Sequence, residues 1–367
     1  MKRLLIWDLP TRLFHWTLAL SFAGAWLTSD ADPWLAVHVF LGELMLGLVG
    51  FRLLWGVVGS PYARFRSFWY GPRAALDYLR QLRRGQASRH VGHNPAGSLA
   101  IYLLLLFTLV IGATGLLTLG GEERHGLAAG WLSHAQGQHM KAWHEAAAIG
   151  MLLLVLGHIA GVLVESYLHH ENLARAMLTG HKLADAATPT TRPRRAVAAV
   201  MLGLMLAFAA WWFFPTGKSL TPNLAFVGPP LADNAQWREE CGSCHLAFHP
   251  SLLPARSWAR LMAGQAQHFG SDLALDDATR AALLAFLTAN AAEQQQTEAA
   301  FKISQSLAPG AEPLRITETP YWVNKHRDIS AAQWRQTQVK SKTNCAACHQ
   351  DAQAGTFEDG AMHLPAP

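Results

Sequence analysis

The sequence predicts an all-α membrane protein whose C-terminal part is a separate, mostly helical soluble domain. Of its 367 residues, 51% are hydrophobic and 15% are charged, a balance too apolar for an ordinary soluble protein. Five apolar runs long enough to cross a membrane as helices lie before residue 215. The 14 tryptophans, many of them near the ends of these runs, suit a membrane-interface belt.

The first apolar run could be mistaken for a secretory signal because it follows a basic start. It lacks a small-residue cleavage site and contains His15, so we expect a retained helix. The fifth run ends at Pro215. The expected membrane helices cover residues 12–29, 34–58, 98–118, 139–165 and 196–214.

The distribution of charge predicts the orientation of these helices. The connections 59–97 and 166–195 are rich in arginine and lysine, which favours the cytoplasmic side, and the other two connections are not. Residues 1–214 hold 18 Lys and Arg against 11 Asp and Glu, and residues 215–367 hold 12 against 14. The net charge of +5 is therefore a topology signal and gives no support for nucleic-acid binding. Five crossings place the C-terminal part outside the cytoplasm.

All four cysteines lie in two C-x-x-C-H motifs of the C-terminal part, which is the attachment pattern of c-type haem. Such haem is attached on the outer face of a bacterial cytoplasmic membrane, the side on which the charge distribution places this domain. We therefore predict two covalently bound haems c and a periplasmic domain. The attachment residues are Cys241, Cys244 and His245, and Cys345, Cys348 and His349.

The sixth ligands of these two haems c are less strongly indicated. We favour His268 and His326, because each lies about twenty residues from a motif, enough chain to wrap around a haem edge. His249 is too close to His245 to reach the opposite face of the same haem, but it could serve the other one. The full set of candidates is His249, His268, His326, His363, Met262 and Met362.

The fourth apolar run carries two histidines, His144 and His158, on one face of the expected helix and about 21 Å apart along it. Helix directions put His144 at the depth of His38 and His158 at the depth of His15. Haem iron binds neutral imidazoles along one axis, so these pairs predict two haems b stacked across the membrane. Histidines that are only hydrogen-bonded inside a bundle are the alternative. We expect most other histidines of the membrane part to be surface residues: His90, His93, His125, His134, His139, His169, His170 and His181.

Arg52 lies near the cytoplasmic end of the second expected helix. Its guanidinium could bind a propionate of the inner haem, or it could extend to the lipid headgroups. The sequence supports both interpretations equally.

Residues 1–190 resemble the bacterial cytochrome b561 family, which includes the cytochrome b subunits of nickel-iron hydrogenases. The resemblance rests on WDLPTRLFHW, HVFLGELMLGLVGFRLLWG, GHNPAGS and the helix with two histidines. It implies a four-helix transmembrane bundle with two haems b that exchanges electrons with quinone, held by His15, His38, His144 and His158. Residues 230–367 resemble the diheme cytochrome c family through CGSCHLAFHPSLLPARSW, HFG and NCAACH. Residues 191–229 would then hold a fifth transmembrane helix and a linker.

These expectations describe a tetrahaem protein of the inner membrane that passes electrons between quinone and a periplasmic soluble cytochrome or other redox protein. As an enzyme it would be a quinol:cytochrome c-type oxidoreductase. Two alternatives stay open: a superoxide:quinone oxidoreductase, and an electron-accepting subunit of a periplasmic dehydrogenase or hydrogenase. The sequence indicates membrane lipid as a partner, excludes nucleic acid, and leaves open a homodimer, the direction of electron flow and the quinone site.

Overall fold

The computed structural model describes residues 2–29, 34–214, 231–358 and 361–365. The chain divides into two compact units, which are described separately. The first contains Met1–Gly115 and Lys141–Asn223, and the second contains Leu116–Met140 and Leu224–Pro367. Residues 215–229 of the expected linker lie outside the described residues.

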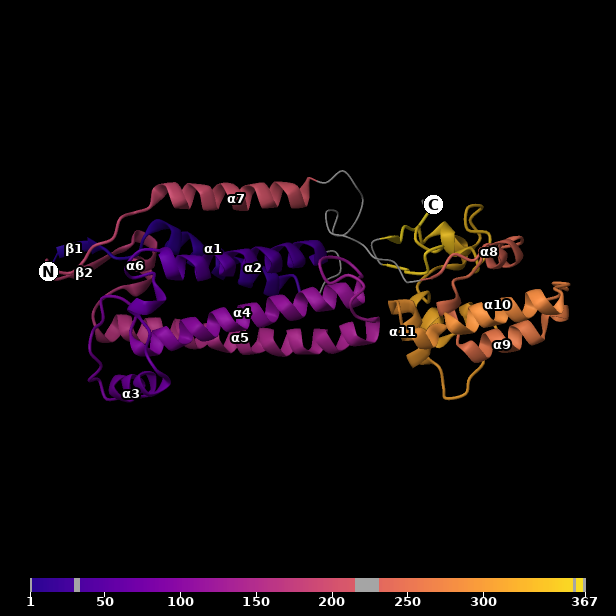
Figure 1. The fold of residues 1–367 in the computed structure, drawn as a ribbon, viewed down its shortest axis with the longest axis horizontal. Helices are drawn as coiled ribbons and strands as arrows, with labels where there is room; N and C mark the ends of the chain where they lie inside the picture. Colours follow the sequence, from indigo (N-terminus) through magenta and orange to yellow (C-terminus); the bar gives the residue numbers. More distant parts are fainter. Residues whose placement is uncertain (1, 30–33, 215–230, 359–360, 366–367) are drawn as a thin grey trace. The chain divides into compact units, whose positions relative to one another are not determined.

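The first unit is a helical bundle with a short two-stranded ribbon at one end (Figure 1). The all-α prediction is confirmed, and the ribbon is an addition to it. Its long helices are α1 (Leu9–Leu27), α2 (Leu35–Val58), α4 (Pro95–Glu122), α5 (His134–Leu168) and α7 (Arg195–Phe213). Its shorter elements are β1 (Lys2–Leu5), α3 (Pro72–Arg83), α6 (Leu173–Thr179) and β2 (His181–Ala184).

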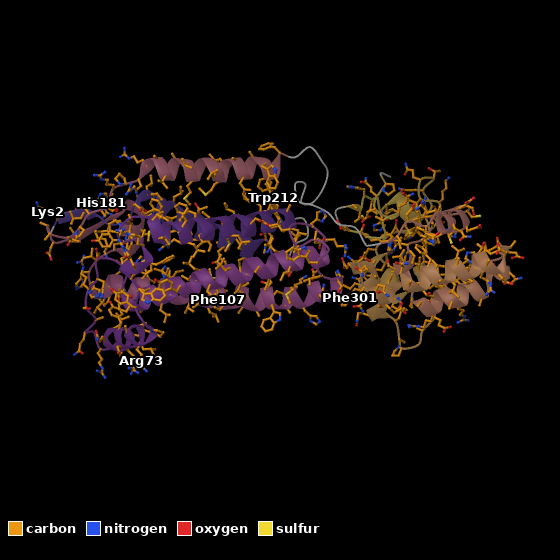
Figure 2. All side chains as sticks on the ribbon, in the orientation of Figure 1. Lys2, Arg73, Phe107, His181, Trp212 and Phe301 are labelled. Carbon is orange, nitrogen blue, oxygen red and sulfur yellow. The ribbon has the colours of Figure 1, made fainter. Side chains whose placement is uncertain are left out.

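Apolar side chains and small residues hold the bundle helices together. One core cluster joins α1, α2, α4 and α7 through Phe14, Leu48, Val49, Leu105 and Met201. A Cβ on Gly112 of α4 would lie 2.2 Å from the Leu46 side chain of α2. A Cβ on Gly150 of α5 would lie 2.5 Å from Phe107 of α4, which Figure 2 labels. Glycine at these positions therefore lets the helices approach closely.

Four helices of the described chain are long and apolar enough to cross a membrane: α2, α4, α5 and α7. The expected first crossing forms α1, but this helix also contains Thr11, Arg12, His15 and Ser21, and composition alone does not identify it as a span. α1 packs along α2 and also contacts α7, so it is part of the same bundle.

One end of the bundle carries structure that the sequence analysis did not predict. β1 pairs antiparallel with β2, with Lys2 opposite Ala184 and Leu5 opposite His181. Gly180 turns the chain into β2 with a φ of +84°, a conformation that favours glycine. α3 lies at the same end, and Figure 2 shows Arg73 on α3 near the end that holds Lys2 and His181. The ribbon ties the N-terminus to the segment that follows α5.

The second unit packs short helices around two small apolar cores. Trp237, Trp258, Leu283 and Leu287 belong to the first core, and Leu252, Ala299 and Ile303 form the second. Polar caps fix several helix starts; Asp276, for example, accepts hydrogen bonds from the backbone of Ala278 and Thr279. The helices of its C-terminal part are α8 (Ala235–Gly242), α9 (Ala255–Ala263), α10 (Asp277–Ala289), α11 (Glu298–Ser306), α12 (Pro320–Lys325) and α13 (Ala331–Trp334).

The connection between α4 and α5 belongs to this second unit, although the predicted domain boundary at residue 190 would assign it to the membrane part. Arg124 donates a hydrogen bond to the carbonyl of Gln296, at 3.1 Å, and the backbone N–H of His134 donates to Gln295, at 3.1 Å. The His134 ring also lies 5.1 Å from the ring of Phe301. His134 is 2% exposed and His125 is 5% exposed, so the expectation that both are surface residues is wrong.

The start of α1 depends on Asp8, which is fully buried. One carboxylate oxygen accepts the backbone N–H of Thr11 at 2.8 Å and caps the helix. The other accepts the indole N–H of Trp55 at 3.1 Å, which joins α1 to α2.

We therefore expect Asp8→Ala to destabilise the bundle by about 2 kcal/mol, because it removes a cap and leaves a buried indole N–H unpaired. Thermal unfolding of the purified protein should show a Tm lowered by about 4–8 °C. Asp77→Ala is the matched control, since Asp77 forms an exposed ion pair with Arg80 and should shift Tm little. Equal Tm values for Asp8→Ala and the wild type would contradict this role.

Candidate functional site

Two of the bundle histidines, His38 of α2 and His144 of α5, face each other with ring centres 6.0 Å apart. The Nδ1 of His38 lies 2.9 Å from the carbonyl oxygen of Ala25, and the Nδ1 of His144 lies 2.9 Å from that of Ile111. A carbonyl can only accept, so each Nδ1 carries the proton and each Nε2 keeps its lone pair. This arrangement is typical of histidines that bind a metal through Nε2.

The second bundle pair joins His15 of α1 to His158 of α5, with ring centres 6.3 Å apart. The ring of Trp16 lies edge-on against His15, with its centre 5.1 Å away. α5 thus supplies one histidine to each pair, because His144 and His158 lie on the same face at two heights. The structure brings together the two pairs that helix direction predicts.

The spacing of the rings fits a metal ion between them. Imidazole nitrogens lie about 2 Å from a bound transition metal, so two rings on opposite sides of one ion have centres about 6 Å apart. Glycines near the pairs leave space for a flat macrocycle. A Cβ added to Gly42 of α2, or to Gly157 or Gly161 of α5, would meet no atom within 4 Å. The bundle residues therefore fit a haem with two axial histidines.

Arg52 of α2 is 4% exposed, too buried to reach lipid headgroups. Its guanidinium lies over the ring of Phe65, 4.7 Å from the ring centre, and its Nη1 has no hydrogen-bond partner in the described part of the chain. A buried cation requires a compensating anion. This environment fits an anionic substituent of a bound group, such as a haem propionate, and disagrees with the snorkelling interpretation.

The C-terminal part contains two further pairs with the same spacing. His245 of the first motif lies 6.4 Å from His268, and His349 of the second lies 6.2 Å from His326, measured between ring centres. The Nδ1 atoms of His245 and His326 lie 2.7 and 2.8 Å from backbone carbonyl oxygens, which again leaves Nε2 available. All four cysteines carry free thiols, the form that haem attachment requires.

Local structure positions His268 and His326. His268 follows α9, and the chain reverses at Gly270, whose φ of +97° favours glycine. His326 caps the C-terminus of α12 and stacks on Trp322, with ring centres 4.2 Å apart. Burial lowers the pKa of both histidines, which favours the neutral form that binds a metal.

The other candidate ligands are differently placed. His249 is 3% exposed, its Nδ1 lies 2.8 Å from the hydroxyl of Ser251, and burial lowers its pKa to about 4. Met262 is buried in the apolar core with Trp258. Met362 forms a backbone bridge with His349, and the N–H of His363 donates to the carbonyl of Cys348. The ring pairs described above therefore favour His268 and His326.

A pocket of about 230 Å³ lies at the end of the bundle that carries α3 and the ribbon. His93, expected to be a surface residue, has its ring between those of Trp7 and Phe68, with centres 4.7 and 4.3 Å away. Burial lowers the pKa of His93 to about 3, and the charges of Arg52 and Lys182 lower it further, so its ring is neutral. The motif GHNPAGS was the signal in the sequence. The pocket is lined by Pro61, Tyr62, Ser67, Tyr70, His90, Val91, Gly92, His93 and Pro189.

Comparison with known proteins agrees with this division. The family model of prokaryotic cytochrome b561 matches residues 6–180, and that of dihaem cytochrome c matches residues 237–357. The probable Ni/Fe-hydrogenase B-type cytochrome subunit of Azotobacter vinelandii is 24% identical over 215 residues, which are 48% of this chain and 88% of that protein. The corresponding protein of Rhizobium leguminosarum bv. viciae is 24% identical over 211 residues, with the same two shares.

Two solved structures resemble the C-terminal part in sequence. The diheme cytochrome c from Rhodobacter sphaeroides is 39% identical and is covered to 98%, over 35% of this chain, with a TM-score of 0.31. The diheme cytochrome type c from Shewanella baltica OS155 is 30% identical and is covered to 93%, over 36% of this chain, with a TM-score of 0.29.

Paired histidines inside an apolar bundle, followed by two C-x-x-C-H motifs, define a multi-pass membrane cytochrome that transfers electrons with haem b and haem c. The chain belongs to the prokaryotic cytochrome b561 family through residues 6–180, and a dihaem cytochrome c domain follows at residues 237–357.

The ring pairs predict how the haems c respond to substitution. His268→Ala and His326→Ala should each convert one haem c from a six-coordinate low-spin form to a high-spin form, visible in the absorption spectrum. His268→Met should instead stay low-spin and raise the potential of that haem. His249→Ala is the control and should leave both haems low-spin. High-spin haem c in His249→Ala together with low-spin haem in His326→Ala would assign the ligand to His249.

Proposed function

We propose that this protein carries electrons between the quinone pool and a periplasmic redox partner through two haems b and two haems c. The observation that carries the proposal is the common geometry of four histidine pairs, with ring centres 6.0, 6.2, 6.3 and 6.4 Å apart. Bound haem would supply one-electron carriers at four places along one chain. The protein supplies the ligands: His15 and His158, His38 and His144, His245 and His268, and His349 and His326.

The bundle end with α3, α6 and the ribbon is the proposed cytoplasmic end. Its connections carry most of the arginines of the membrane part, and positively charged connections stay inside. Depth then places the His15/His158 pair toward the cytoplasm and the His38/His144 pair toward the periplasm. With α1 counted as a crossing, α7 leads the chain to the periplasm, in the bacterial inner membrane.

The pocket beside His93 is the proposed site for a quinone headgroup. Its volume of about 230 Å³ and its apolar and aromatic walls suit a small ring, and its polar groups suit the oxygens of a quinone. The Nδ1 of His90 lies 3.0 Å from the carbonyl oxygen of Ser88 and therefore carries a proton. The Nε2 of His90 can then accept a hydrogen bond from a hydroxyl of a quinol.

The connection between α4 and α5 supports exchange between the two sets of haems. It forms one unit with the cytochrome c domain through the contacts of Arg124 and His134, and α5 continues from His134 to His144. The ligand helix of the proposed outer haem b is therefore an extension of a segment that the cytochrome c domain contacts.

A second candidate function runs in the opposite direction. The relatives from Azotobacter and Rhizobium are named as B-type cytochrome subunits of Ni/Fe-hydrogenases. By analogy, an external dehydrogenase or hydrogenase would deliver electrons to the cytochrome c domain, and quinone would be reduced at the inner pocket. The same ligands and the same pocket serve both directions.

Stopped-flow mixing of the purified protein with a short-chain quinol tests the proposal. In the wild type, the absorption bands of reduced haem b and reduced haem c should both appear. His38→Ala should reduce the inner haem b and leave the haems c oxidised, because it removes a ligand of the intermediate site. His139→Ala is the matched control, since His139 is on the same helix as His144 but five residues earlier and on another face. No reduction of any haem in the wild type by quinols of either naphthoquinone or benzoquinone type would contradict quinone exchange.

A further inference from the structure

A buried carboxylate lies at the proposed cytoplasmic end of α5. Glu165 is 8% exposed. It follows His158 by seven residues on the same helix, which places it within about 20° of the same face and about 10 Å further along the axis. The helix that supplies a ligand to the inner pair therefore also presents an ionisable group on the same side.

The side chain of Glu165 is held by a phenol and an imidazole. The hydroxyl of Tyr78, which is 3% exposed, donates to Oε1 at 2.7 Å. Burial raises the pKa of Tyr78, and the neighbouring carboxylate raises it further, so this hydroxyl keeps its proton. Oε2 lies 3.4 Å from the Nε2 of His169, one turn further along, whose side chain is 13% exposed.

The cations of this region are engaged elsewhere. Glu171, six residues after Glu165, lies 3.0 Å from Arg89 and 3.5 Å from Lys182. Lys182 also donates to the carbonyl of His90, at 3.1 Å. Among the described residues, His169 is the basic side chain within ion-pair distance of Glu165. The groups facing Glu165 from neighbouring elements are Tyr78 of α3, Asn94 before α4, His169 after α5 and Lys182 of β2.

We propose that Glu165 is a redox-linked proton-binding residue, which takes up a proton when an electron reaches the His15/His158 site and releases it when the electron leaves. The electron comes from quinol or from the outer site, and the proton comes from the cytoplasmic solvent by way of His169. An electron about 10 Å away raises the proton affinity of a partly buried carboxylate about tenfold or more. The inference rests on the proposed function through the assignment of His15 and His158 as ligands of one haem.

The partners of Glu165 suit this role better than a purely structural one. A carboxylate that only anchored α3 would be expected beside Arg89 or Lys182, as Glu171 is. Glu165 instead has a neutral donor on one oxygen and a titratable imidazole near the other, so it can gain or lose a proton without breaking an ion pair with arginine or lysine. The side chain of His169, at the solvent-facing end, provides exchange with water.

The test is a redox titration of the full-length protein in detergent between pH 5 and 9. The inner signal is identified as the one that His15→Ala removes. Over the interval in which Glu165 titrates, its electron affinity should fall about tenfold for each pH unit in the wild type, which is about 59 mV for a one-electron couple. Glu165→Gln keeps an acceptor for Tyr78, so it should fold, and its potential should be independent of pH. Glu165→Asp should restore the dependence.

Glu171→Gln is the matched control and should keep the pH dependence, because Glu171 is compensated by Arg89 and Lys182. The infrared difference spectrum between the oxidised and reduced protein gives a second readout, in which the band of a protonated carboxyl should be present in the wild type and absent in Glu165→Gln.

Two results would overturn the inference: a wild-type inner potential that does not change with pH, or a pH dependence that survives in Glu165→Gln. Failure of the proposed function looks different, since His15→Ala would then remove no haem signal at all.

Discussion

The structure depends on pairs of imidazoles held about 6 Å apart with their Nε2 atoms available. In the outer bundle pair this is achieved by two backbone carbonyls, Ala25 and Ile111, which accept the Nδ1 protons of His38 and His144. Each carbonyl belongs to the helix that packs against its histidine, so the orientation of the ligand depends on the packing of α1 on α2 and of α4 on α5. A change in helix packing would therefore change the ligand geometry directly.

This constraint explains features of the bundle far from the histidines. Gly112 and Gly150 let α4 approach α2 and α5, and Asp8 fixes both the start of α1 and its hydrogen bond to Trp55 of α2. The small residues Gly42, Gly157 and Gly161 leave the space beside the rings that a macrocycle needs. In the cytochrome c domain the same ring spacing is reached without a bundle, because short helices and turns bring His268 and His326 to the two motifs.

Much of this could be predicted from the sequence, since hydrophobic runs, loop charges and C-x-x-C-H motifs depend on local composition. The pairing of His15 with His158 also followed from helix direction. The buried positions of His93, His125 and His134 could not be predicted, because they depend on which distant segments cover them: Trp7 and Phe68 for His93, and Phe301 for His134. The ribbon between β1 and β2 was missed because four-residue strands 176 residues apart leave almost no pattern in the sequence.

The central claim is that the chain holds as many haems in the membrane bundle as in its C-terminal domain. A pyridine haemochrome assay on the purified full-length protein measures this most directly, because it distinguishes non-covalent haem b from covalent haem c. Four histidine pairs predict a b:c ratio of one, and His144→Ala should lower the haem b content by half with haem c unchanged. A ratio far from one, or loss of haem c in His144→Ala, would contradict the account.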